Sequence, residues 1–131
     1  MRGSLVPPEV PLHRSRAERF DDLVLLAVSQ LEPRWETELS GVEFAVEEIP
    51  PAEPDPDEPD TVPLARLDPG SATDSEQVRP ARIVLYRRPL MARADGHEEL
   101  AELVLDVIVE EFAHWLGVDP QTVDPGYPGE D

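Results

Sequence analysis

The stretch that decides the fold is residues 97–117, HEELAELVLDVIVEEFAHWLG, near the C-terminal end of the chain. Apolar residues recur in it every three or four positions, which is the spacing of an amphipathic helix. Asp95 and Glu98 have the spacing of an N-terminal capping box, and Gly117 is typical of a left-handed C-cap. We therefore expect one helix of about 20 residues with one face on a hydrophobic core.

This helix carries most of its charge on one side. On a helical wheel, one arc holds a histidine and four acids: Glu99, Glu102, Asp106, Glu110 and His114. Glu111 instead falls within the apolar arc. A carboxylate that faces a core is costly unless it is paired, hydrogen-bonded or neutralised. We therefore expect Glu111 to be mostly buried, either bound to an arginine, a backbone donor or the hydroxyl of Tyr86, or placed in a functional cleft.

Glu110 and His114 are four residues apart, so their side chains lie one turn apart on the same face of the helix. This is the geometry that a helical metal site needs, and we expect both side chains to face a cleft. A histidine in the last turn of a helix is also favoured by the helix macrodipole without any metal. The residues alone leave both interpretations of His114 open.

The rest of the chain supplies a second helix and a small sheet. Ser15 and Glu18 form a capping box, after which apolar residues repeat at helical spacing up to Pro33, with a further short turn of helix at residues 35–39. Strands are predicted at residues 42–47, 64–67 and 83–86, the last closed by Pro89. This order predicts an α+β fold in which two main helices pack on a small three-stranded sheet.

A chain of 131 residues with 40% hydrophobic residues fits one domain with one modest core. We expect an extended Pro-rich arm over residues 1–14, the domain over residues 15–120, and a C-terminal tail over residues 121–131. Residues 50–61 alternate proline with acid and are expected to be a solvated loop. Arg87 and Arg88 are expected to snorkel or to balance nearby acids rather than to bind a substrate carboxylate.

The chain is strongly acidic, with 29 acidic and 11 basic residues and a net charge of −18. Such a charge repels phosphate backbones and anionic lipid surfaces, so we expect neither nucleic acid nor a membrane as a partner. Cysteine is absent, which excludes disulfides, a thiolate nucleophile and Cys-ligated zinc. No segment approaches the roughly 20 apolar residues of a membrane span, and a cytoplasmic protein is the default expectation.

Residues 16–119 resemble the small bacterial zincin-like metallopeptidases. The resemblance lies in the order of a first helix, AERFDDLVLLAVSQL, a strand, GVEFAVEE, a strand that ends in RRPL, and the acidic final helix. It implies a minimal zincin-like domain whose final helix carries the motif H-E-x-x-H-x-x-G-x-x-D. In that motif two histidines and the aspartate bind zinc, and the glutamate is the general base.

The motif is only partly present in this chain. By resemblance, Glu111 matches the general base and His114 the second histidine, whereas Glu110 stands in place of the first histidine. Pro120 stands in place of the aspartate, with Asp119 one residue early. Catalytic zinc needs three protein ligands and an open position for water. The pattern EExxH in place of HExxH therefore predicts a degenerate site with zinc absent or weakly bound.

Two functions are compatible with this pattern. The first is an inactive or altered family member that binds a peptide or protein, or serves as a scaffold. The second is a metal-dependent peptidase or hydrolase in which Glu110, His114 and Asp119 are the ligands and Glu111 is the general base. Such an oxygen-rich ligand set favours harder cations than zinc. Whether the protein is an enzyme stays open on the sequence.

Overall fold

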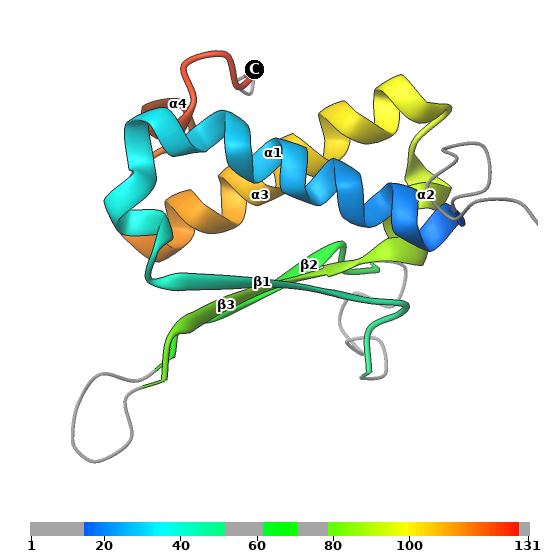
Figure 1. Ribbon diagram of the computed structural model, residues 1–131, viewed down its shortest axis with the longest axis horizontal. Coiled ribbons are helices and arrows are strands. Elements are labelled where there is room, and N and C mark those ends of the chain that lie inside the picture. Colours follow the sequence, from blue (N-terminus) through cyan, green and yellow to red (C-terminus); the bar gives the residue numbers. More distant parts are fainter. Residues whose placement is uncertain (1–14, 52–61, 71–78, 129–131) are drawn as a thin grey trace, which may run out of the picture.

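The computed structural model describes residues 15–51, 62–70 and 79–128. The elements in this part of the chain are, in order, α1 (Arg16–Leu39), β1 (Val42–Glu47), β2 (Ala65–Asp68), β3 (Ala81–Tyr86), α2 (Arg87–Arg93), α3 (His97–Leu116) and α4 (Pro120–Val123). The long helices α1 and α3 lie together on one side of the sheet (Figure 1). The predicted α+β fold, with two main helices on a three-stranded sheet, is confirmed.

The sheet has the strand order β1-β3-β2. β1 runs parallel to β3, with Val42 opposite Ala81, and β2 runs antiparallel to β3, with Ala65 opposite Leu85. β3 is therefore the central strand, and its continuous apolar run is fully buried. A continuous rather than alternating run suits a strand that is covered on both faces.

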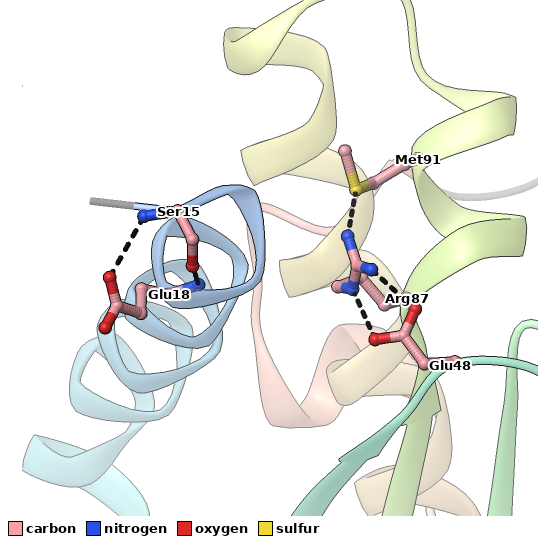
Figure 2. Close-up of polar contacts among 5 residues, drawn as sticks. All are labelled: Ser15, Glu18, Glu48, Arg87 and Met91. Carbon is pink, nitrogen blue, oxygen red and sulfur yellow. Dashed lines mark hydrogen bonds and ion pairs between the residues drawn. The ribbon is translucent and has the colours of Figure 1, made fainter. Parts of the chain in front are cut away.

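α1 begins with the predicted capping box. The Glu18 amide donates to Ser15 Oγ at 3.0 Å, and the Ser15 amide donates to Glu18 Oε1 at 3.0 Å (Figure 2). The helix does not end at Pro33 but continues to Leu39, with non-helical angles at Trp35 (φ −126°, ψ 24°). The two helical segments that the sequence suggests are thus one helix that bends just after its proline.

α3 begins one residue later than predicted. Gly96 is the N-cap, with φ 104°, a value that glycine tolerates better than other residues. The predicted capping box of Asp95 with Glu98 is wrong. Instead, the Glu99 carboxylate accepts a hydrogen bond from the amide of Asp95, just before the helix.

α3 ends as predicted at Gly117, which has left-handed angles (φ 78°, ψ 31°). The amides of Gly117 and Val118 both donate to the Ala113 carbonyl, at 2.8 and 3.0 Å. These bonds satisfy a carbonyl that the helix end would otherwise leave free. They also set the direction in which the chain leaves α3 toward Asp119 and Pro120.

The core lies between the two long helices and the sheet. Val104, Ile108 and Phe112 of α3 are fully buried, and Trp115 is half-buried beside them, which confirms the predicted apolar face. α1 supplies the facing side chains: Phe20, Leu23, Val24, Ala27 and Leu31. The polar arc of α3 consequently points away from this core.

The two short helices are absent from the sequence-based prediction. α2 follows β3 without a break, and Pro89, which we expected to close the strand, lies in the first turn of α2. A proline is tolerated there because the amides of the first turn have no partner within the helix. Arg87, at the start of α2, pairs with Glu48 through Nε and Oε2 at 3.0 Å (Figure 2), so its predicted role in balancing an acid is confirmed.

α4 lies beyond the end of the predicted final helix. Val123 is buried in the core, and its carbonyl accepts a hydrogen bond from Trp35 Nε1 at 2.9 Å. The Trp35 ring in turn meets Phe112 edge to face, with ring centroids 5.8 Å apart. Residues 120–123 are therefore packed against both long helices.

Candidate functional site

Glu110 and His114 lie in the last two turns of α3, and both side chains are exposed. They share one face of the helix, as their spacing of four residues requires. Because both side chains point away from the core, packing in the core does not explain why these two residue types occur here.

The Glu110 carboxylate has a partner that the sequence does not reveal. Its Oε2 atom accepts a hydrogen bond from the hydroxyl of Tyr127. Tyr127 follows α4, and its amide donates to the Asp124 carbonyl at 2.9 Å. The residue at the position of the family's first histidine thus contacts the C-terminal segment, which we expected to be a tail. Nothing in the local sequence around Tyr127 signals this contact.

Glu111 lies on the other side of the same turn and is half-buried. Burial raises the pKa of its carboxyl, while the nearby His114 lowers it and Glu110 raises it further. Within the described residues, no hydrogen bond or ion pair reaches this carboxylate. The predicted partner Tyr86 accepts a hydrogen bond from Arg66 Nη1 at 3.1 Å instead. The predicted phase of the helix is right, and the described residues do not supply the partner that is predicted for Glu111.

Asp119 and Pro120 form the start of α4. Asp119 is the N-cap residue, and its carbonyl accepts a hydrogen bond from the Thr122 amide at 2.9 Å. Its exposed side chain makes no capping hydrogen bond. Pro120 occupies the first position of the helix, where a fixed φ and a missing amide hydrogen are favourable. Both residues thus contribute to the start of α4.

The neighbourhood of Glu110 is acidic. Asp106, one turn before it on α3, has its pKa raised by partial burial and then by the charges of Glu110, Glu102 and Asp124. A raised pKa means that the ionised form of Asp106 is disfavoured in the folded protein. The predicted acidic side of α3 therefore continues onto the segment that follows α4.

The candidate ligands do not converge on one point. In the described parts of the chain, no three histidine, aspartate or glutamate side chains are grouped so that they could hold a metal ion. Glu110, His114 and Asp119 all lie in those parts, and the Glu110 carboxylate is already hydrogen-bonded to Tyr127. Three protein ligands around one ion are the minimum for catalytic zinc. As the structure has them, Glu110, His114 and Asp119 do not form such a group.

None of the described helices combines the length and the apolar character that crossing a membrane requires.

Comparison with known proteins identifies the family. A search of curated proteins finds no match. The model of the family described as "Zincin-like metallopeptidase" matches residues 39–129. The matched residues include the sheet, α3, α4 and Tyr127. This match supports a metallopeptidase-like function and suggests zinc as the metal. The match spans more than half of the sequence, and the chain belongs to the zincin-like metallopeptidase family.

Proposed function

We propose that this chain is a non-catalytic member of its family, in which two metal-ligand positions have taken structural roles and the domain binds a peptide or protein without cleaving it. The observation that carries the proposal is the hydrogen bond from Tyr127 to Glu110. Because of this bond, the Glu110 side chain is already occupied within the protein, although it would have to be the first metal ligand of the motif.

The second ligand position has changed in a similar way. Pro120 stands where the family's aspartate is expected, and it has no side-chain donor for a metal. As the first residue of α4 it instead helps to begin the helix that carries the buried Val123. Asp119, the nearest carboxylate, is the N-cap of that helix. Positions 110 and 120 therefore both contribute to holding the C-terminal segment on α3.

With only His114 matching a family ligand, zinc binding is expected to be weak or absent. A family member with a complete motif would supply a zinc-bound water of lowered pKa, which the glutamate deprotonates. Glu111 keeps the position of that glutamate, but its base function depends on a nearby ion. The expected partner is a peptide or protein rather than nucleic acid, since the net charge is −18.

A specific observation favours the second candidate, a metal-dependent hydrolase. Glu111 is half-buried, its pKa is raised, and no described residue bonds to it. A carboxylate in that condition is suited to general-base chemistry, because its pKa moves toward the working pH. In this candidate Glu110, His114 and Asp119 hold a hard cation after Glu110 has exchanged Tyr127 for the ion.

Metal content separates the two candidates. The purified protein is analysed for bound metal, titrated with zinc and manganese by calorimetry, and assayed for peptide cleavage beside a Glu111→Gln variant. We expect no stoichiometric metal and no cleavage that depends on Glu111. Tight stoichiometric metal together with cleavage that disappears in Glu111→Gln would contradict the first proposal and establish the hydrolase.

A further inference from the structure

β1 is an edge strand, and within the described residues only β3 pairs with it. The Ala81 amide of β3 donates to the Gly41 carbonyl at 3.2 Å, and Ala81 lies opposite Val42. Alternate residues of a strand direct their backbone groups to the same side, so the amides and carbonyls of Val42, Phe44 and Val46 point away from β3. Backbone groups of this kind at a sheet edge can pair with a further strand.

A groove with a volume of about 430 Å³ lies between β1 and the first half of α1, on the helical side of the sheet (Figure 1). Phe44 and Val46 line it from β1, and both are half-buried. Leu25 lines it from α1 and is 68% exposed. A strand added beside β1 would direct every second side chain toward this groove, where apolar side chains would cover Leu25 and Phe44.

The opposite face of β1 carries acids. Glu43 and Glu47 alternate with the groove residues along the strand, and both are exposed. Arg82 of β3 lies opposite Glu43, and Tyr86 lies opposite Glu47. Basic side chains on an added strand would lie next to both carboxylates, which is a favourable cross-strand arrangement. A second copy of β1 would instead bring four carboxylates together on one face, and two chains of net charge −18 repel each other.

The polar end of the groove also favours a basic partner. Asp21 and Glu48 line it together with Arg87. Arg87 is bonded to Glu48 (Figure 2), and the charge of Asp21 acts on the same guanidinium group. Two carboxylates therefore share one cation, which leaves this end of the groove acidic. Charge of this sign attracts positively charged segments and disfavours acidic ones.

We propose that the outer edge of β1 binds an extended peptide segment in which apolar side chains alternate with lysine or arginine. The peptide pairs with the outward backbone groups of β1, places its apolar side chains in the groove and directs its basic side chains to Glu43 and Glu47. β1 packs beneath α1, whereas β2, at the other edge of the sheet, packs beside α3. The surface is therefore separate from the motif positions. This inference deepens the binding part of the proposed function, on which it rests, by naming the surface and the kind of peptide.

The first test compares three peptides by calorimetry with the full-length protein. Acetyl-RVRVRV-amide has the proposed pattern, acetyl-EVEVEV-amide reverses its charge, and acetyl-RRRVVV-amide keeps its composition without the alternation. We expect saturable binding of the first peptide, about tenfold or more tighter than that of the other two. Equally tight binding of the acidic or the non-alternating peptide would overturn the proposal, as would no binding of the first.

Amide hydrogen exchange measured by NMR tests the strand pairing. The bound peptide should slow exchange at Val42, Phe44 and Val46, because their amides point outward. Exchange at Glu43 and Ala45 should change little, because their amides already face β3. An association through charge alone would not produce this alternation, so its absence in the complex would contradict the proposal.

Leu25→Ala tests the groove. It should weaken binding of acetyl-RVRVRV-amide about fivefold or more, because apolar area is no longer covered. Leu26→Ala is the matched control, since Leu26 is the next residue on α1, is 51% exposed and does not line the groove. Its affinity should be that of the wild-type protein, and an equal loss in both variants would place the peptide elsewhere. Circular dichroism checks that each variant is folded.

Charge variants test the opposite face of β1. Glu43→Gln and Glu47→Gln together should weaken binding of the basic peptide about fivefold, with a smaller difference at high salt. Glu32→Gln and Glu36→Gln together remove the same charge from exposed positions near the other end of α1 and should change affinity little. An equal loss in the two double variants would show attraction by net charge rather than pairing at β1.

Photocrosslinking identifies the occupant of the groove. The chain has no cysteine, so Leu25→Cys carries a benzophenone label at one position. We expect the label to crosslink to acetyl-RVRVRV-amide when the peptide is present. Crosslinks to residues 1–14 of the same chain or to a second copy, in place of the peptide, would overturn the proposal. Metal content and cleavage, which decide the loss of catalysis, enter none of these measurements, so the two proposals can fail separately.

Discussion

The hydroxyl of Tyr127 donates a hydrogen bond to the carboxylate of Glu110, 17 positions earlier in the chain. From the other side, Trp35 donates to the carbonyl of Val123. The segment after α3 is therefore held to both long helices. In the motif that the chain resembles, an aspartate at the position of Pro120 would bind zinc. In this chain the segment is held by these two hydrogen bonds and by the buried Val123.

The Tyr127–Glu110 contact predicts energetic coupling between the two residues. Tyr127→Phe removes only the hydroxyl and is expected to lower the free energy of unfolding by about 1 kcal/mol or less, because the contact is exposed. Glu110→Ala should cost a similar amount, and the double variant should cost little more than either single one. Urea denaturation of the four proteins measures this cycle, and strictly additive losses would show that the contact contributes no stability.

Val123 tests whether α4 belongs to the folding unit. Val123→Ala removes two buried methyl groups and is expected to lower the free energy of unfolding by about 2 kcal/mol, from lost burial and the cavity left behind. Val118→Ala is the matched control, because Val118 is exposed and its replacement should change stability by less than about 0.5 kcal/mol. Equal effects of the two substitutions would contradict the packed position of α4.

The parts of the fold that follow from periodicity could be predicted from the sequence. The long apolar repeats identify α1 and α3, and the apolar run 83–86 identifies the central strand, because burial leaves a regular trace along the chain. The short helices α2 and α4 span seven and four residues, too few for such a trace. In both, a proline that reads as a breaker lies in the first turn, where it is tolerated.

Some features of the candidate site could likewise be predicted from the sequence, and others could not. The spacing of Glu110, Glu111 and His114 fixes which of them are exposed and which is half-buried, since all lie on one regular helix. The contact of Glu110 with Tyr127 depends on how the chain turns at Gly117 and passes through α4. Long-range contacts of this kind leave no local pattern. Helical phase likewise locates Glu111 at the margin of the core but does not identify its neighbours.

Glu111 predicts a pH dependence of stability. Burial raises its pKa above the ordinary 4.5, so the folded protein binds this proton more tightly than the unfolded chain. Its contribution to stability is therefore greatest below the unfolded pKa, and it is lost as the pH rises through the folded pKa. Glu111→Gln should raise the free energy of unfolding at neutral pH and give no gain at about pH 3.

Urea denaturation at both pH values, with Glu43→Gln on the exposed face of β1 as the control, measures the effect of Glu111. Because Glu43 is exposed, its substitution should give nearly the same small change at both pH values. Destabilisation by Glu111→Gln at neutral pH would mean that the carboxylate has a favourable partner when ionised.

The Arg87–Glu48 ion pair predicts a pH dependence of stability that is opposite to that of Glu111. The hydrogen bond from Arg87 lowers the pKa of Glu48, so the pair contributes stability above the unfolded pKa and loses it as the pH falls through the folded pKa. Glu48→Gln should reduce stability slightly at neutral pH, with a smaller difference at high salt and none in strong acid. Thermal melting measures this, and the neighbouring exposed Glu47→Gln should lack the pH-dependent difference.

The last prediction concerns restoration of the family's ligand set. Glu110→His alone should improve zinc binding only partly, because Pro120 still leaves the third ligand position without a donor. Adding Pro120→Asp supplies two imidazoles and one carboxylate, and we expect a further gain on the order of tenfold or more in zinc affinity. Both changes carry a cost, since the first disturbs the contact with Tyr127 and the second removes a favourable helix start. Asp119→Ala in the wild-type protein tests whether that carboxylate substitutes for the missing ligand. Calorimetric titration gives the affinities, and zinc should raise the melting temperature of the double variant in proportion to binding. Tight zinc binding by the wild-type protein, lost in Glu110→Ala, would instead make Glu110 a metal ligand.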